Sequence, residues 1–181
     1  TTKNLTIANL GNYNLNFNIT TPLKVIPTLD GVISAGEWDD ANVINITASG
    51  VPNPVTMLVK NDCTHAYFAF VDTNDLTYNY YDQAGIGFDE DHDGQWQEPP
   101  SNDSEGNFYV YEGDFDGVGI PADIIFQSLP DETQYSNPPG VSGALSNTMG
   151  YMVYEVAIEL GTSPLDCAPG DTIGIWVYCA N

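Results

Sequence analysis

The sequence predicts an all-β protein, a two-sheet antiparallel β-sandwich of the jelly-roll type with an extension strand at its N-terminus. Two observations support this fold class. Apolar and polar residues alternate with a period of two in several segments, which is the spacing of a half-buried strand. Gly, Pro, Asn and Asp separate these segments at short intervals, and no long stretch has the period of a helix. Short strands divided by regular turns are typical of sandwiches.

The predicted strands follow one another along the whole chain. In order, they are residues 4–8, 12–20, 42–48, 54–60, 66–72, 84–88, 107–112, 122–127, 151–160 and 172–179. The alternation is clearest in the second, "NYNLNFNIT", where asparagines alternate with four apolar residues, Tyr13, Leu15, Phe17 and Ile19. All four side chains are therefore expected on one face of that strand.

The segments between the strands are predicted as turns and loops. "VTMLVKNDCTHAYFAFVD" predicts a hairpin that turns at Asn61 and Asp62, and "GEWDDA" predicts one short helical turn. Residues 89–106 and 128–149 are the longest irregular stretches and are predicted as loops, where binding residues are usually found. We expect residues 1–25 to form an N-terminal arm and residues 26–181 to form one sandwich domain.

The charge of the chain limits its partners. It contains 25 acidic residues, three lysines and no arginine, which gives a net charge of −22. Such a surface repels phosphate backbones and anionic membranes, so nucleic acid is not expected as a partner. No apolar run approaches the roughly 20 residues that a membrane-spanning helix needs.

Four Asn-X-Ser/Thr sequons predict covalent N-glycans on Asn4, Asn18, Asn45 and Asn102. The sequence begins at Thr1 without a methionine, as expected of a mature protein whose signal peptide has been removed. Together these observations favour a secreted glycoprotein located outside the cell or at its surface.

Three cysteines allow at most one intrachain disulfide. Cys167 and Cys179 flank a predicted strand, which at about 3.3 Å per residue holds them too far apart to bond. Cys63 is therefore the expected partner of one of these two cysteines, and of the two pairings that remain we predict Cys63 with Cys167. The alternative is three buried thiols.

An acidic loop, "DEDHDGQWQE", predicts a calcium site. Carboxylates at alternating positions followed by a glycine can wrap a hard cation in oxygen ligands. The predicted ligands are Asp89, Asp91, Asp93, Gln95 through its backbone carbonyl, and Glu98. The alternative is a solvated acidic turn. Further acidic pairs are Asp114 with Asp116, and Asp72 with Asp75 at the tip of the predicted hairpin.

Four stretches resemble DOMON-like sandwiches of the family-9 carbohydrate-binding-module type. They are "PTLDGVISAGEWDDA", "LVKNDCTHAYFAFVDTND", "GIGFDEDHDGQW" and "PGDTIGIWVY", and the resemblance covers roughly residues 26–179. It implies a two-sheet sandwich with a structural calcium and a sugar-binding face, where two loop tryptophans grip the end of a sugar. Trp38 and Trp176 are expected in the core. Trp96 lies in a loop and is the candidate for stacking on a sugar.

Catalysis has little support in the sequence. Neither His65 nor His92 has a serine or cysteine partner in a recognisable arrangement, and no nucleophile or phosphate-binding motif occurs. We therefore expect a protein that is not an enzyme.

The strand at residues 12–20 allows two hypotheses, because it precedes the region of family resemblance. In the first, it is a donor strand that completes the sheet of the next copy, with Pro22 and Pro27 bracketing a stiff hinge. Head-to-tail exchange would build an extracellular filament, similar to archaeal-type surface filaments and stabilised here by calcium. In the second, it is an edge strand of its own sandwich, and the protein is a secreted carbohydrate-binding module or a cell-surface recognition domain.

Overall fold

The computed structural model describes residues 6–9, 17–18, 25–47, 50–79, 82–89, 92, 106–111, 123–128, 134–161, 167 and 170–180. This part of the chain is all-β and contains no helix. Its strands are β1 (Thr6–Asn9), β2 (Phe17–Asn18), β3 (Asn42–Ile46), β4 (Val55–Asn61), β5 (His65–Asp72), β6 (Gln83–Asp89), β7 (Gly106–Tyr111), β8 (Asp123–Ser128), β9 (Gln134–Ser136), β10 (Val141–Ser146), β11 (Met152–Glu159) and β12 (Thr172–Ala180).

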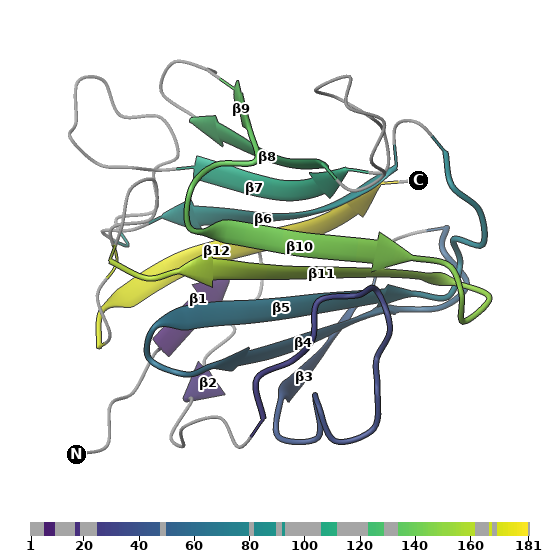
Figure 1. Ribbon diagram of the computed structural model, residues 1–181, viewed down its shortest axis with the longest axis horizontal. Helices are drawn as coiled ribbons and strands as arrows, with labels where there is room; N and C mark the ends of the chain where they lie inside the picture. Colours follow the sequence, from purple (N-terminus) through teal and green to yellow (C-terminus); the bar gives the residue numbers. More distant parts are fainter. Residues whose placement is uncertain are drawn as a thin grey trace.

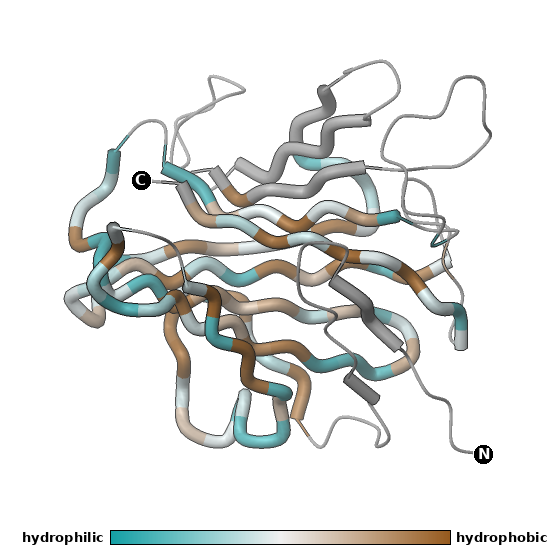
Figure 2. Tube along the Cα trace, turned by 180° about the vertical axis from the view of Figure 1, so that it is seen from behind, coloured by the Kyte–Doolittle hydropathy of each residue, from teal (hydrophilic) through white to brown (hydrophobic). Residues whose placement is uncertain are grey.

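The strands form two sheets, which confirms the predicted sandwich (Figure 1). A seven-stranded sheet has the order β2-β1-β12-β6-β7-β8-β9, and a five-stranded sheet has the order β10-β11-β5-β4-β3. Neighbouring strands are antiparallel, except that β1 pairs with β12 in parallel. Figure 2 shows hydrophobic segments running through the central strands, and hydrophilic segments gathered at the turns.

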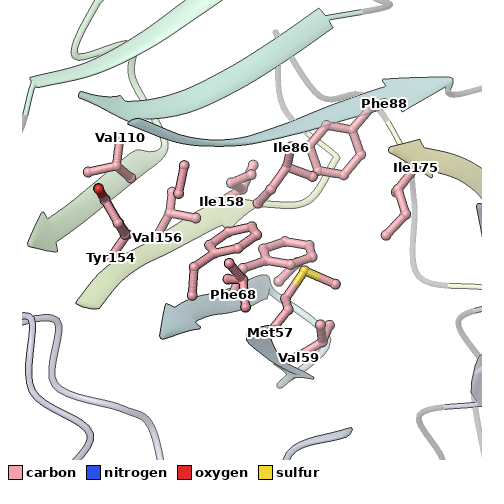
Figure 3. Packing of buried hydrophobic residues seen from close by; sticks show 14 of the residues in the cluster. Met57, Val59, Phe68, Ile86, Phe88, Val110, Tyr154, Val156, Ile158 and Ile175 are labelled. Carbon is pink, nitrogen blue, oxygen red and sulfur yellow. The ribbon is translucent and has the colours of Figure 1, made fainter. Parts of the chain in front are cut away.

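The main core lies between the two sheets. Side chains from β4, β5 and β11 point toward side chains from β6 and β12 (Figure 3). Phe68 of the five-stranded sheet meets Phe88 of the seven-stranded sheet edge to face, with ring centroids 6.2 Å apart. Every second side chain of β11 faces this core, namely Tyr154, Val156 and Ile158, which explains why the strand packs against the seven-stranded sheet.

A second apolar layer covers the outer face of the five-stranded sheet. Residues 25–41 cross that face, and the cluster there consists of Trp38, Leu58, Tyr67, Ala69 and Ala157, with Leu29, Ile33 and Ala41 packed against it. This layer explains the buried Trp38 that the sequence predicted. It also leaves no open binding face over these residues of the sheet.

Glu155 of β11 fixes this covering segment. Its carboxylate is fully buried and accepts hydrogen bonds from the backbone N–H groups of Asp30 at 2.9 Å and Gly31 at 2.8 Å. The indole Nε1 of Trp38 donates a third bond at 3.0 Å. Gly31 has a φ of 74°, and a Cβ there would lie 2.4 Å from the backbone nitrogen of Ser146. Glycine is therefore required where this segment passes β10.

Lys60 holds the other end of the same segment. It is only 2% exposed, and its Nζ donates to the carbonyl oxygen of Glu37 at 2.5 Å and to the carboxylate of Asp40. The ammonium also lies 5.9 Å from the centre of the Trp38 ring, which adds a cation–π contact. A buried lysine is tolerated here because its charge is paired.

Three local predictions need correction. The stretch 128–149 was predicted as a loop but contains β9 and β10, and β10 is stabilised by pairing with β11 along six residues. "GEWDDA" forms two successive turns, closed by Glu37 N–H to Ser34 and Ala41 N–H to Trp38, in place of a helical turn. The hairpin turns at residues 62–64, because the Asp62 carboxylate accepts the backbone N–H groups of Thr64 and His65.

The described part of the N-terminal arm pairs within its own chain. β1 runs beside β12, and Phe17 and Asn18 of β2 pair with β1. Tyr13, Leu15 and Ile19 lie outside the described residues. This pairing is the arrangement expected of an edge strand in the chain's own sandwich, so the donor-strand hypothesis gains no support from it.

The predicted disulfide between Cys63 and Cys167 is not formed. None of the three cysteines, all of them described, takes part in a disulfide. Cys63 is exposed in the β4–β5 turn, whereas Cys167 is buried and packs in the main core. The two side chains therefore occupy different environments. Burial, followed by the nearby carboxylates of Asp72 and Asp75, raises the pKa of the Cys179 thiol.

Candidate functional site

Three loops meet at one end of the sandwich, where β5 and β10 end and β6 begins (Figure 1). They are residues 50–54, 73–79 and 147–151. Asn53 and Asn74 join the first two loops, because the Asn53 N–H donates to Asn74 Oδ1 at 3.1 Å and Asn74 Nδ2 donates to the Asn53 carbonyl at 2.9 Å. The Met152 N–H donates to the Asp75 carbonyl at 2.9 Å and joins the third. We call this surface the loop end.

Exposed apolar side chains concentrate at the loop end. Seven large hydrophobic residues are exposed in the described part of the chain, and four lie here: Val51, Leu76, Tyr78 and Met149. Leu76 is 58% exposed and Tyr78 is 45% exposed. Beside them, the hydroxyl of the half-buried Tyr151 contacts the Met149 sulfur at 3.6 Å. Apolar side chains gathered on one surface indicate a binding site more often than scattered ones do.

Three buried carboxylates lie beneath these loops. Asp72, Asp75 and Asp82 are each no more than 5% exposed. Asp75 accepts a hydrogen bond from the Tyr154 hydroxyl at 3.1 Å, and Asn79 Nδ2 donates to Asp82 at 2.8 Å. Burial raises the pKa of Asp75, and the neighbouring carboxylates of Asp82 and Asp72 add to that effect. The one lysine within the described residues, Lys60, is paired with Asp40 and does not neutralise them.

Such a surface suits a ligand with one apolar face and several hydroxyl groups. Aromatic and aliphatic side chains can pack against C–H groups, while the exposed amides of Asn53 and Asn79 can form hydrogen bonds with hydroxyls. A pyranose sugar has both features. The hydrogen bonds between Asn53 and Asn74, and between Met152 and Asp75, hold the loops in place before a ligand arrives. This lowers the entropy cost of binding.

The predicted calcium loop begins in the sequence at Asp89, the last residue of β6. Asp89 is fully buried and lies about 20 Å from Gln83 at the start of this strand. His92 follows with a φ of 60°, and its Nδ1 is buried without a hydrogen-bond partner. Most of the predicted ligands lie outside the described residues: Asp91, Asp93, Gln95, Glu98, Asp114 and Asp116. Among the described side chains, no group of three acidic, histidine or cysteine residues is placed to hold a metal ion.

The other predicted site residues have mixed outcomes. Trp96, Asn4 and Asn102 lie outside the described residues, and only the backbone of Asn18 is described. Asn45 is exposed on β3, and its Oδ1 accepts a hydrogen bond from Thr56 at 3.3 Å. Trp176 was expected in the core but lies half-buried on the opposite face of β12, because Ile175 and Val177 are the residues that face the core.

Sequence reasoning missed the loop end as a site. Tyr78 lies in "NDLTYNYYDQ", a segment rich in aromatic and acidic residues that no predicted strand covers. Such a composition in a loop could have indicated a binding site. The contribution of Met149 and Tyr151 could not be foreseen, because the pairing of β5 with β11 brings their loop to this end.

Comparison with known proteins supports the fold. The chain is similar to a carbohydrate-binding module of family 9 from Caldicellulosiruptor kristjanssonii, solved in complex with cellotriose. The TM-score is 0.52 at 11% sequence identity, and the match covers 87% of this chain and 68% of that chain. At this identity the likeness shows the fold alone. No family model matches the chain, and no curated protein matches it. The described residues contain no helix long and apolar enough to span a membrane.

Proposed function

We propose that this protein is a non-catalytic domain that binds a neutral carbohydrate at the loop end. The observation that carries the proposal is the exposure of Tyr78, Leu76 and Met149 on loops that meet at one end of the sandwich. The structural likeness to a module solved with cellotriose supports the same class of ligand. The net charge of −22 repels glycans that carry carboxylate or sulfate groups, so a neutral glycan is expected.

Binding would use two kinds of contact. The Tyr78 ring would stack on the apolar face of a pyranose, with Leu76 and Met149 extending the contact. The side-chain amide of Asn79, which is exposed and already oriented by Asp82, would bond to sugar hydroxyls. Residues 25–41 cover the outer face of the five-stranded sheet, so the ligand is not expected to bind there.

Isothermal titration calorimetry tests the proposal with cellotriose, xylotriose, mannotriose and an acidic trisaccharide. At least one neutral sugar is expected to bind, and the acidic one is not. Tyr78→Ala should weaken binding about 2- to 10-fold, since an aromatic stack contributes about 0.5–1.5 kcal/mol. Val43→Ala is the matched control, because Val43 is exposed on β3, away from the loop end. Absence of binding to every neutral sugar would contradict the proposal.

We also propose that calcium binds in the loop that follows Asp89. The buried carboxylate of Asp89 and the alternating acids after it are oxygen donors of the kind that calcium prefers. The orphaned His92 nitrogen does not add to this argument, because calcium takes oxygen ligands. Chelator should lower the melting temperature and calcium should restore it, since an ion that binds only the folded state stabilises it. Asp91→Asn with Asp93→Asn should abolish the response, and an identical melting curve with and without chelator would contradict the site.

A further inference from the structure

Two aromatic rings lie flat on the outer face of the seven-stranded sheet. Trp176 and Tyr178 of β12 are paired in register with Gly87 and Gly85 of β6. A Cβ on Gly87 would lie 2.2 Å from three adjacent atoms of the Trp176 benzo ring, and a Cβ on Gly85 would lie 2.3 Å from Cζ of Tyr178. The rings therefore occupy the space that a side chain would fill at either glycine.

The distances also give the orientation of the indole. Three adjacent atoms of a six-membered ring that are equally far from one point place that point on the axis of the ring. The benzo ring of Trp176 thus turns one face toward the backbone of Gly87 and the other face away from the sheet. Both side chains are half-buried and alternate with core residues on β12, so their outer faces belong to the surface of the sheet. We call the two rings over the two glycines the aromatic strip.

The aromatic strip is continuous with the loop end. β6 begins at Gln83, directly after the buried Asp82, and Gly85 lies only about 10 Å along the chain from Asp82. Gln83 alternates with Gly85 and Gly87, which puts it on the same face of β6 as the strip. Tyr178 is the ring nearer the loops, because it pairs with Gly85 while Ala180, two residues further on, pairs with Gln83.

We propose that the aromatic strip extends the loop-end site, so that the protein binds a linear neutral glycan along its chain rather than a single sugar unit. The proposal rests on the proposed carbohydrate-binding function and deepens it. Trp176 and Tyr178 are two residues apart, about 6.6 Å along the strand, and present two stacking faces in a row. Gln83 adds an amide for hydroxyl groups at the end nearer the loops.

A sugar chain fits this surface better than a second copy of the protein. Two copies would each bring a net charge of −22 to the contact, and like charges facing each other oppose association. A neutral glycan brings no charge. Rings that lie parallel to the sheet suit the flat face of a pyranose, and two rings give too narrow an apolar surface for a stable protein interface.

Calorimetry with a disaccharide, a trisaccharide and a hexasaccharide of the same neutral glycan tests this inference. The hexasaccharide is expected to bind about 3- to 10-fold more tightly than the disaccharide, because it reaches the second stacking surface. Trp176→Ala should lower the hexasaccharide affinity toward the disaccharide value. Tyr78→Ala should weaken all three sugars. Trp176→Phe keeps a flat ring over Gly87 and should retain most of the gain with length, which separates stacking from stability.

Each result of this experiment has one meaning. A hexasaccharide that binds no more tightly than the disaccharide would overturn the strip, and so would a folded Trp176→Ala protein with unchanged length dependence. Light scattering that shows a dimer dissociated by Trp176→Ala would overturn it in favour of a second copy. If no neutral sugar of any length binds, the proposed function itself fails.

Discussion

Glu155 is the residue that fixes the covering segment, residues 25–41, to the outer face of the five-stranded sheet. It has no exposed surface, and it accepts bonds from Asp30 and from Trp38, which lie 125 and 117 residues away in the sequence. Desolvation raises the pKa of this carboxyl, and the three N–H donors only partly offset that cost. Glu155 lies in the segment "MVYEVAIEL", on the face that alternates with Tyr154 and Val156 of the main core. Its burial follows from a tertiary contact that strand periodicity cannot reveal.

Glu155→Gln is expected to lower the free energy of unfolding by about 1–3 kcal/mol. The amide would place an NH₂ group against donors, so at least one buried N–H would lose its acceptor. Glu159→Gln on the same strand is the control, because Glu159 is half-exposed. Urea denaturation of both variants gives the comparison. Equal stability of the two variants would show that the buried carboxylate does not hold the covering segment.

Among the strands, the alternation of apolar and polar residues predicted those whose side chains face the main core. It did not predict a strand that forms only because a neighbouring strand pairs with it. Segments rich in Val, Ile and Phe, such as β4, β5 and β12, were predicted within about two residues of their ends. β10 reads "VSGALS", and its small residues gave no periodic pattern. It is a strand because β11 offers it six backbone partners. The jelly-roll-type class therefore followed from the sequence, but the full strand order did not.

The arm is the element whose role is most open to experiment. With β1 and β2 paired to β12 and to each other, we expect single particles in electron micrographs of the native protein. Filaments that disappear when residues 1–20 are deleted would contradict this expectation. That outcome would mean that the strand exchanges between copies.

For the whole molecule, the excess of acidic groups predicts greater stability at moderately low pH. Burial raises the pKa of Glu155 above 4.5 and that of Asp75 above 3.8. A carboxyl with a higher pKa in the folded state contributes stability that is full below its unfolded pKa and is lost as the pH rises through its folded pKa. Asp62 changes the stability in the opposite direction, because its pKa is lowered in the folded state. Burial opposes its ionisation, but hydrogen bonds from Thr64, His65 and Tyr67 hold its pKa below 3.8, so it loses its contribution only in stronger acid.

The melting temperature should therefore rise as the pH falls from 7 to about 4, the usual pKa range of Asp and Glu in unfolded chains, by about 2–4 °C for each kcal/mol gained. Protonation also weakens the mutual repulsion among the carboxylates that give the net charge of −22, which raises the melting temperature further. Differential scanning calorimetry in calcium-free buffers at constant ionic strength measures the change. A melting temperature that falls steadily over this range would contradict the assignment of raised pKa values.

At this scale, the proposed function depends on loops that are distant in the sequence. The sequence directed attention to residues 89–106, whereas the described structure gathers exposed apolar groups from residues 50–54, 73–79 and 147–151. Each of those loops alone is short and ordinary. Hydrogen bonds of Asn53, Asn74 and Asp75 join the three loops into one surface. No local pattern in the sequence predicts this joint surface.

An NMR titration of the isotope-labelled protein with cellotriose tests the central claim most directly. We expect the largest amide shifts in residues 73–79 and 147–151, with smaller shifts at Tyr178 and Gln83. Residues of β3, at the far edge of the five-stranded sheet, should not move. Shifts confined to β3 or to the covering segment 25–41, or no shifts with any neutral oligosaccharide, would contradict a carbohydrate site at the loop end.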